Sequence, residues 1–297
     1  MPIVAAVFPG QGAERPGVGL DWLDDPLFSV ASRACAVDAS HALRRFSTDL
    51  ARTAVLQPLL LALALTAWTR LVRRGVQFAF VAGHSVGEIG AWAATGGVSF
   101  ADAITLGAAR GRAMEREATQ RPGAMLALSA DVDVGQVLAH AGATCVVAAC
   151  NGPKQNVISG DVVAILRAEQ RFGGRRLAVA GAWHSPLVDG AKDDLSRALA
   201  RIASARAEGP RLITGLDGTL LAHGASPDLV AQVTAPVAWD RVMATLERVG
   251  VTDVVALAPG RTGRALLRGA LGERVRIHVA DSDRDLDVIA RSVRGET

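Results

Sequence analysis

Short apolar runs alternate with longer amphipathic segments along the chain. The run at residues 3–8 stops at Pro9 and Gly10, which predicts a buried first strand that leads into a tight loop. A second apolar run at 77–82 is followed by a glycine-rich turn and a helical pattern, and it also predicts a strand. Strands that alternate with helices in this way are typical of α/β proteins with a parallel sheet.

Long helices are expected on both sides of the second strand. The first covers residues 58–74, with Pro58 in its first turn. The second covers 101–118, and Ser99 is its expected N-cap. The most apolar stretch, 53–68, is shorter than the roughly 20 residues of a membrane span and contains a glutamine and a proline. We therefore expect a buried helix there and no membrane segment.

The pattern changes after residue 122. Residues 123–180 follow the order strand, helix, strand, strand, helix, strand, which is that of a ferredoxin-like α+β unit. We predict a small subdomain at 123–180, inserted into a large subdomain formed by 1–122 and 181–297. The elements expected within the insertion and after it are strands at 124–129, 144–150, 155–159, 175–180, 211–214 and 253–257, and helices at 133–141, 161–172, 186–204 and 239–248, with a final helix–strand–helix run.

Composition narrows the function classes only coarsely. Half of the 297 residues are hydrophobic and 21% are charged, so we expect a soluble globular protein. The net charge is +3, and no dense Lys/Arg tract is interleaved with aromatic residues, which argues against nucleic-acid binding. Three cysteines without metal-ligand spacing, and no signal peptide, indicate a reducing cytoplasm and no metal site.

Candidate chemistry begins with VAGHSVGEIG at residues 81–90, where Ser85 lies within G-x-S-x-G between an expected strand and an expected helix. This is the context of a nucleophile elbow, although glycines flank serines in ordinary tight turns as well. At an elbow, the Ser85 Oγ stands clear of the sheet, and the backbone N–H of Val86 points toward the space where an acyl oxyanion forms.

A serine nucleophile needs a base, and six histidines are available. His184 lies in a loop between the end of an expected strand and Pro186, a favoured catalytic region in α/β folds, and spacing alone leaves its role open. His84 is adjacent to Ser85, which favours a structural role, and His278 alternates like a strand residue. The remaining histidines are expected in solvent: His41, His140 and His223.

Several short motifs follow one another along the chain. They are FPGQGAE at 8–14, QP at 57–58, GHSVGE at 83–88, ARGRAM at 109–114, GAMLAL at 123–128, NGPKQNVISG at 151–160, GAWHSPL at 181–187 and APVAW at 235–239. With these motifs the sequence resembles the malonyl-CoA:acyl carrier protein transacylases and the acyltransferase domains of polyketide synthases. The resemblance extends over essentially the whole chain and implies a hydrolase-like α/β core with a ferredoxin-like insertion. The active site would lie between the two.

The resemblance also implies roles for individual residues. Ser85 would carry the acyl group as an ester, and His184 would be its general base. The main-chain N–H groups of Gln11 and Val86 would form the oxyanion hole. Arg110, whose own pattern suggests only an exposed helix arginine, would hold the free carboxylate of a malonyl-type group in a bidentate pair.

Further residues are implied around this centre. The backbone carbonyl of Gln232 would orient His184, while Asn151 and His84 would border the substrate. Trp183 takes a position that is often phenylalanine in malonyl-selective polyketide domains and serine in methylmalonyl-selective ones. A bulky indole should crowd an α-methyl branch, which favours malonyl.

Some positions depart from the family pattern, and these departures affect the expected identity of the acyl group more than the expected type of reaction. Ala235 replaces a common asparagine, and ALAPG at 256–260 replaces a Glu-x-Gly-Pro-Gly pattern. The pocket could therefore serve an unusual acyl unit.

The function that the resemblance implies is ping-pong acyl transfer from a coenzyme A thioester to the phosphopantetheine thiol of a separate acyl carrier protein. We expect a monomer with no permanently bound cofactor. The alternatives are an editing acyl-thioester hydrolase or esterase, the malonyl-transfer subunit of a malonate decarboxylase, and an inactive docking module. An ordinary α/β-hydrolase would place its histidine late in the chain, where the candidate is His278.

Overall fold

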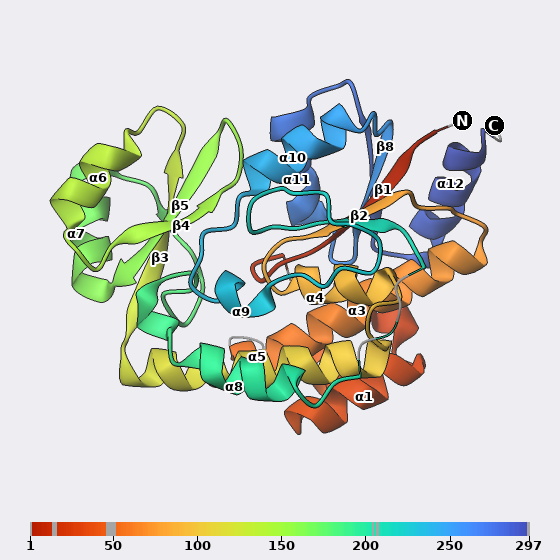
Figure 1. The fold of residues 1–297 in the computed structure, drawn as a ribbon, viewed down its shortest axis with the longest axis horizontal. Helices are drawn as coiled ribbons and strands as arrows, with labels where there is room; N and C mark the ends of the chain where they lie inside the picture. The colour runs from red at the N-terminus through yellow and green to blue at the C-terminus, as the bar shows by residue number, and fades with distance from the viewer. Residues whose placement is uncertain (1, 14–16, 46–51, 204, 206–207, 296–297) are drawn as a thin grey trace.

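The computed structural model describes residues 2–13, 17–45, 52–203, 205 and 208–295. Within them the chain forms a five-stranded sheet with the order β7-β2-β1-β8-β9 and a four-stranded sheet with the order β4-β5-β3-β6 (Figure 1). The large sheet is parallel and the small one antiparallel. The predicted α/β class, with a parallel sheet and a small α+β unit, is confirmed.

All strands of the large sheet run in the same direction, so their carboxyl ends share one edge. The central strand is wholly buried, and its last residue, Phe8, pairs with Gly83 at the end of the neighbouring strand. Loops that follow these two strands therefore meet, which is where ligands bind in open α/β sheets. The strands are β1 (Val4–Phe8), β2 (Phe80–Gly83), β7 (Arg211–Ile213), β8 (Asp253–Leu257) and β9 (Arg276–Ala280).

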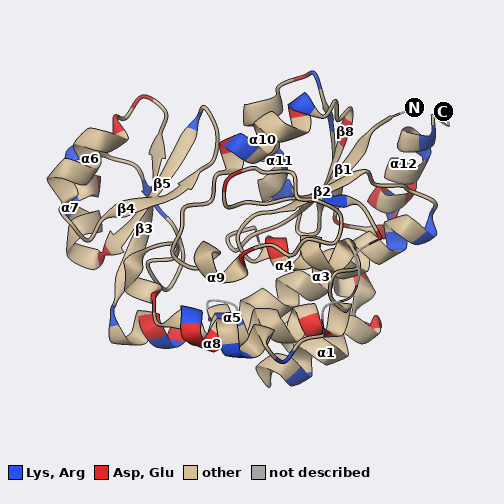
Figure 2. Ribbon diagram, in the orientation of Figure 1, with Lys and Arg blue, Asp and Glu red and all other residues tan. Residues whose placement is uncertain are grey.

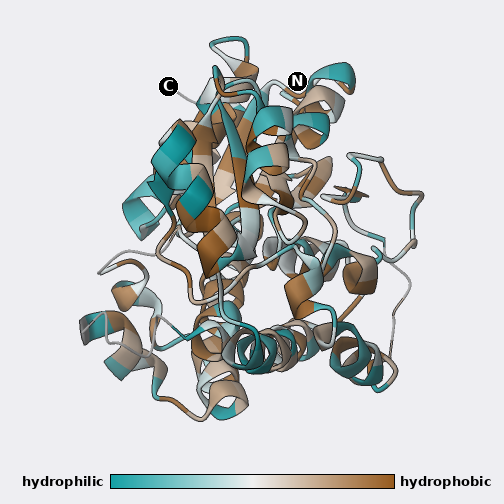
Figure 3. Ribbon diagram, turned by 90° about the vertical axis from the view of Figure 1, so that its left-hand side faces the viewer, coloured by the Kyte–Doolittle hydropathy of each residue, from teal (hydrophilic) through white to brown (hydrophobic). Residues whose placement is uncertain are grey.

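Helices cover both faces of the large sheet (Figure 1). On one face lie α3 (Thr53–Arg73), α4 (Gly87–Ala94), α5 (Phe100–Gln120) and α12 (Asp283–Arg294), and on the other lie α10 (Trp239–Arg248) and α11 (Arg261–Leu271). The hydrophobic residues gather along the inner strands and helices, and the outer helices are hydrophilic (Figure 3). The other helical segments are α1 (Pro26–Cys35), α2 (Ala39–Arg45), α8 (Ala191–Leu199), α9 (Leu229–Gln232), η1 (Leu20–Trp22) and η3 (Pro186–Val188).

Helix α3 begins at Thr53 and not at residue 58, so Pro58 lies inside the helix and the predicted start was wrong. A proline inside a helix removes one backbone hydrogen bond, but every residue from Thr53 to Trp68 is buried, and that burial outweighs the loss. By length and composition α3 could cross a membrane, yet 83% of its most apolar window is buried inside the protein. The predicted buried helix is confirmed.

The small sheet has the predicted β-α-β-β-α-β order (Figure 1, left). Its last strand covers only Arg175–Arg176. The Leu177 N–H still donates to the Met125 carbonyl at 3.0 Å, but the side chains of Leu177 and Val179 pack against the main core. The boundaries of the subdomains at 122/123 and 180/181 stay a prediction. The elements are β3 (Gly123–Ser129), α6 (Val134–Ala141), β4 (Val146–Cys150), β5 (Gln155–Asp161), α7 (Val162–Phe172) and β6 (Arg175–Arg176).

The helix predicted at 186–204 is broken into η3 and α8 around Gly190. A Cβ on Gly190 would lie 2.6 Å from the carboxylate oxygens of Glu117 on α5, so the chain turns where α5 approaches it. The expected N-cap of α5 is confirmed, since the Ser99 hydroxyl accepts a hydrogen bond from the Asp102 N–H at 3.0 Å.

Candidate active site

The turn between β2 and α4 presents Ser85 in a left-handed conformation, with φ of 54°. A non-glycine residue there costs about 1–2 kcal/mol, and a nucleophile elbow accepts this strain. A Cβ on Gly83 would lie 2.1 Å from the backbone of Gly87, and one on Gly87 would lie 2.4 Å from the Phe8 carbonyl oxygen. Both glycines of G-x-S-x-G are thus required by close packing at the carboxyl edge of the sheet.

His184 faces this serine from a loop that is distant in sequence. Its Nε2 lies 2.8 Å from the Ser85 Oγ. Its Nδ1 lies 3.0 Å from the backbone carbonyl oxygens of both Gln232 and Ala235. Because a carbonyl oxygen only accepts, Nδ1 carries the proton, and the lone pair of Nε2 faces the hydroxyl.

The imidazole of His184 is held in its neutral form. Burial, together with the positive charge of Arg110 and the proximity of His84, lowers the pKa of His184 to about 3, against the hydrogen bonds that its Nδ1 donates to the Gln232 and Ala235 carbonyls, which raise it. Two neutral carbonyls take the place of the aspartate of a serine–histidine–aspartate triad. The ring is therefore ready to accept the serine proton at neutral pH.

Arg110 is fully buried, with 1% of its surface exposed, although charged residues lie mostly on the outer helices (Figure 2). The pattern-based interpretation as an exposed helix arginine was wrong. Its Nη2 donates to the Ser85 Oγ at 3.2 Å and to the Gln232 Oε1 at 3.4 Å, and its Nη1 donates to the Gln57 Oε1 at 3.0 Å. Its Nε has no hydrogen-bond partner among the described residues.

The loop after β1 brings Gln11 to the same edge. Its Oε1 accepts from the Thr53 hydroxyl at 2.9 Å, and Thr53 in turn accepts from the Gln57 amide at 2.8 Å. The backbone N–H groups of Gln11 and Val86 donate no hydrogen bond within the described part of the chain. Val86 directly follows the serine, and a Cβ on Gly10, the neighbour of Gln11, would lie 2.8 Å from the His84 ring, so both unused donors belong to segments at the elbow.

His84 and Asn151 form a contact on the side of the small sheet. The His84 Nε2 lies 3.0 Å from the Asn151 Oδ1, and the Asn151 Nδ2 donates to the Gln155 Oε1 at 2.9 Å. The His84 ring also meets Trp239 edge-on, and burial lowers the pKa of His84. These contacts tie the elbow to the small sheet and to α10, and a substrate-binding role of either residue stays a prediction.

Trp183, directly before the base, is buried with 4% exposure. A Cβ on Gly181 would lie 2.5 Å from its ring, so the indole packs closely over that glycine. Its Nε1 has no hydrogen-bond partner in the described residues. Its predicted effect on the choice of acyl group remains a prediction.

The hydrogen bonds described above form one network around Ser85. Three of its polar residues had no role in the sequence analysis: Thr53, Gln57 and Glu88. Gln57 lies alone in the most apolar stretch of the chain, and Glu88 follows the serine by three positions. Both are 1% exposed, and Glu88 accepts a hydrogen bond from the Gln232 amide. An isolated polar residue in an apolar helix was the available signal, because such a residue needs a buried partner.

The sequence profile of the acyl transferase domain family matches residues 6–216. The chain belongs to this family. It is 33% identical to the malonyl CoA-acyl carrier protein transacylase of Mycobacterium tuberculosis, over 97% of this chain and 99% of that protein. It is 34% identical to a phenolphthiocerol synthesis polyketide synthase of Mycobacterium marinum, over 94% of this chain and 14% of that protein. The crystal structure of MCAT from Mycobacterium tuberculosis superimposes with a TM-score of 0.88, at 32% identity, over 97% of this chain and 99% of that chain.

A histidine–carboxylate pair in this acyl transferase lies at the other end of the sheet. The His278 Nε2 is 2.9 Å from the Asp253 Oδ1. Asp253 opens β8 beside Val4, at the amino ends of the strands, whereas Ser85 follows their carboxyl ends. His278 therefore does not complete a hydrolase-type triad with Ser85.

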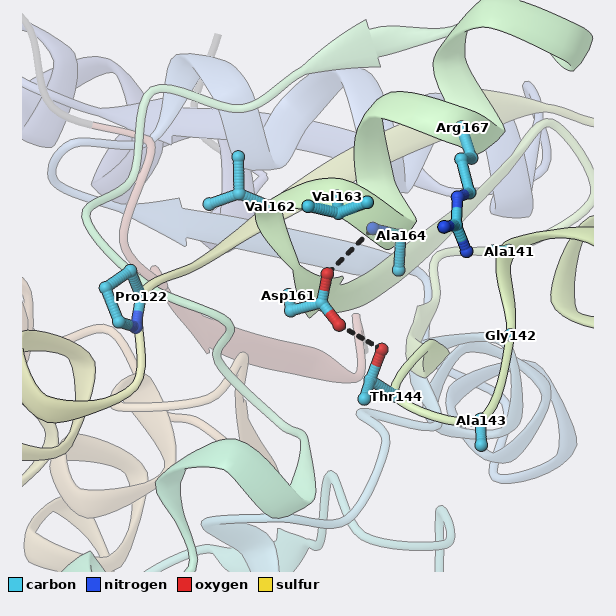
Figure 4. A pocket seen from close by; sticks show the side chains of 10 residues that line it. All are labelled: Pro122, Ala141, Gly142, Ala143, Thr144, Asp161, Val162, Val163, Ala164 and Arg167. Carbon is cyan, nitrogen blue, oxygen red and sulfur yellow. Dashed lines mark hydrogen bonds between the residues drawn. The ribbon is translucent and has the colours of Figure 1, made fainter.

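An open pocket on the small sheet is also separate from the serine (Figure 4). The Asp161 carboxylate there accepts from the Thr144 hydroxyl and from the Ala164 N–H, so it caps α7. The lining residues are Pro122, Ala141, Gly142, Ala143, Thr144, Asp161, Val162, Val163, Ala164 and Arg167. They include no residue of the Ser85 network, and the carboxylate already has its partners.

Proposed function

We propose that this chain transfers a malonyl group from coenzyme A, through an ester on Ser85, to the phosphopantetheine thiol of an acyl carrier protein. The observation that carries the proposal is the buried Arg110 guanidinium, which lies 3.2 Å from the Ser85 Oγ and keeps its Nε without a partner among the described residues. An acyl group on Ser85 that ends in a carboxylate reaches this cation. The relatives named as malonyl CoA-acyl carrier protein transacylases support the same reaction.

In the first half-reaction the Ser85 hydroxyl passes its proton to the His184 Nε2, and its Oγ attacks the thioester carbonyl carbon. The carbonyl oxygen becomes negative and accepts hydrogen bonds from the Gln11 and Val86 backbone N–H groups. When the tetrahedral intermediate collapses, the carbon–sulfur bond breaks and His184 returns the proton to the coenzyme A sulfur. The product is a malonyl ester on Ser85.

The second half-reaction runs the same steps with the carrier thiol. His184 takes the thiol proton, and the sulfur attacks the ester carbonyl. The bond to the Ser85 Oγ breaks, and the proton on His184 goes to that oxygen. The neutral imidazole serves both halves as base and then as acid, and each half leaves it neutral again.

Arg110 supplies the preference for a carboxylated acyl group. A guanidinium fits a carboxylate in a bidentate pair, and the burial of this one removes competing water. An acetyl group would leave the cation without an anionic partner, so we expect it to load less well. Trp183 would further exclude α-branched groups, while Asn151 and His84 would border the acyl chain.

The partners follow from the reaction. Coenzyme A thioester and a carrier protein on a separate chain are the substrates, and the mechanism uses no permanently bound cofactor. We propose a monomeric cytoplasmic enzyme. Arg110 argues against an esterase for neutral acyl groups, and His278, the late histidine that such a hydrolase would use, is paired with Asp253 at the amino ends of the strands.

The test is incubation of the enzyme with labelled malonyl-CoA, followed by intact-mass analysis and addition of holo-carrier protein. A malonyl adduct should appear, be absent in Ser85→Ala, and move to the carrier. If free malonate formed as fast as malonyl-carrier, the protein would be a hydrolase and the transfer proposal would be overturned.

A further inference from the structure

The only carboxylate whose charge acts on the buried Arg110, among the residues described, is that of Glu88, and the two do not touch. Every direct partner of the guanidinium is neutral: Gln57, Ser85 and Gln232. Glu88 is itself 1% exposed in the first turn of α4. A buried cation without a compensating charge is costly, so a carboxylate one amide away has an electrostatic effect on it.

The Gln232 side chain bridges the two charges. Its Nε2 donates to the Glu88 Oε2, and its Oε1 accepts from the Arg110 Nη2 at 3.4 Å. A flipped amide would place its NH₂ against the guanidinium and its oxygen against the carboxylate, which are repulsive contacts. The pair of charges therefore sets the orientation of the amide.

Gln232 also faces the base through its main chain. Its backbone carbonyl accepts from the His184 Nδ1 at 3.0 Å, and the residue is 1% exposed. Gln232 thus contacts both the base, His184, and the carboxylate-binding Arg110. Glu88 accepts a hydrogen bond from the side-chain amide of Gln232. The Gly215 backbone comes close to the same carboxylate, since a Cβ on Gly215 would lie 3.1 Å from the Glu88 Oε2.

We propose that Glu88 is a positioning residue of the acyl-transfer site, which orients Gln232 and sets the preference for carboxylated acyl groups by balancing the charge of Arg110. The proposal rests on the proposed function, because it assumes that Arg110 receives the acyl carboxylate. Glu88 touches neither Ser85 nor the acyl group, and it acts through Gln232 and through its charge.

The charge balance depends on pH. Burial raises the pKa of Glu88 to about 7, against hydrogen bonds from Thr214, Gly215 and Gln232 and the charge of Arg110. The other titratable groups of the network are His184, which shares Gln232, and His84, which acts on His184. An acyl carboxylate at Arg110 competes with ionised Glu88, so its binding favours the protonated form of Glu88.

The preference for malonyl over acetyl should increase as the pH falls. Above pH 7 Glu88 is ionised, offsets Arg110 and weakens malonyl binding. As the pH falls through about 7, Glu88 takes up a proton and the preference for malonyl over acetyl rises. Taking the ratio of the two substrates cancels the titration of coenzyme A and of His184, because both substrates share them.

The experiment measures the concentration dependence of Ser85 acylation by malonyl-CoA and acetyl-CoA, with intact-mass detection, between about pH 6 and pH 8.5. In the wild type the malonyl/acetyl ratio should rise by about tenfold toward low pH, a change equal to one unit of coupled pKa shift. Glu88→Gln keeps an acceptor for the Gln232 amide without the charge. Its half-saturating malonyl-CoA concentration should fall at high pH, and its ratio should no longer depend on pH.

Glu88→Ala removes the acceptor as well, so the maximal acylation rate should fall for both substrates. Glu117→Gln is the matched control, since Glu117 is a buried carboxylate paired with Arg116 and Arg121 and lies outside the Ser85 network. It should lower the melting temperature and leave the ratio and its pH dependence unchanged.

A ratio in the wild type that is flat with pH would overturn the charge-balance part, even where Glu88→Gln does not fold. A Glu88→Gln enzyme that folds and keeps the pH-dependent ratio of the wild type would overturn it too. Equal maximal rates in Glu88→Ala and the wild type would overturn the orienting role. These outcomes differ from failure of the proposed function, in which the wild type forms no malonyl adduct at all.

Discussion

The two ends of the parallel sheet each hold a histidine with a polar partner, and they differ in what the histidine faces. At the carboxyl ends, His184 faces the Ser85 Oγ and two neutral backbone carbonyls. At the amino ends, His278 faces the buried carboxylate of Asp253, which also accepts two hydrogen bonds from Arg276. No serine or cysteine joins that second group among its hydrogen-bond partners in the described residues.

This difference shows that a histidine–carboxylate pair is not by itself a sign of catalysis. In the pair at the amino ends the carboxylate is saturated, since Asp253 contacts Arg276, His278 and the Thr252 hydroxyl, and these contacts join β8 to β9. At the carboxyl ends the serine, the arginine Nε and the backbone N–H groups of Gln11 and Val86 keep hydrogen-bonding capacity that no described residue uses. Such capacity is what a substrate needs, and the loops at the carboxyl edge supply it.

Replacing the histidine at each end of the sheet should give the largest difference in the rate of Ser85 acylation. His184→Asn should lower the rate of Ser85 acylation by about 10²–10⁴-fold, since the serine loses its proton acceptor. His278→Asn should leave that rate within about twofold of the wild type, because no substrate group reaches it. Acylation is followed by intact mass with malonyl-CoA. A comparable loss in both variants would contradict the assignment of the base.

Removing the Arg110 guanidinium should affect malonyl loading and acetyl loading differently. Arg110→Ala should lower malonyl loading by about 10–100-fold, the value of a charge-assisted hydrogen bond, and spare acetyl loading. Arg112→Ala is the matched control on the same helix, where the exposed side chain donates to the Ala34 carbonyl. Equal loss of malonyl and acetyl loading in Arg110→Ala would rule out a carboxylate-binding role.

The saturated pair should matter for stability alone. Asp253→Asn keeps the size of the side chain but removes the charge that Arg276 and His278 face. We expect the free energy of unfolding to fall by about 1–3 kcal/mol, with acylation kinetics unchanged. Urea denaturation measures the first quantity. An Asp253→Asn enzyme of wild-type stability would mean that the pair contributes little.

The smallest expected effect is that of pH on acetyl loading, which should show almost no pH dependence. Because the pKa of His184 is lowered far below 6.5, its imidazole stays neutral and basic as the pH falls through that value. Acetyl loading, which does not use Arg110, should therefore stay nearly constant down to about pH 5.5. A base with an ordinary pKa of about 6.5 would lose about tenfold between about pH 7.5 and pH 5.5. A tenfold drop would show that His184 titrates normally.

Much of the fold could be predicted from hydrophobic periodicity. Runs of apolar residues such as 3–8 and 77–82 indicated the strands, and the six-element order within 123–180 indicated the small sheet. The wrongly predicted element boundaries are those that tertiary contacts determine. Pro58 lies inside α3, and the side chains of Leu177 and Val179, after Arg176, pack on the large core. Local sequence does not carry the burial that offsets a proline or ends a strand.

The candidate site was only partly visible in the sequence. G-x-S-x-G and a strand-end histidine indicated Ser85 and His184, and family resemblance supplied Arg110, Gln11 and Gln232. The connections between them were not visible. Gln57, Glu88 and the segment that holds Gln232 and Ala235 are three different parts of the chain, and periodicity contains no information on which of them meet.

The sequence by itself determined the elbow, because Gly83 and Gly87 are the residues that leave room for a sharp turn after a strand. It also determined which residue types were available for chemistry. Only the tertiary structure decided which histidine is paired with Ser85 and that Arg110 is buried beside it. The physical reason is that a parallel sheet gathers loops from distant segments at one edge, and burial there makes the pKa of a group depend on its neighbours in space.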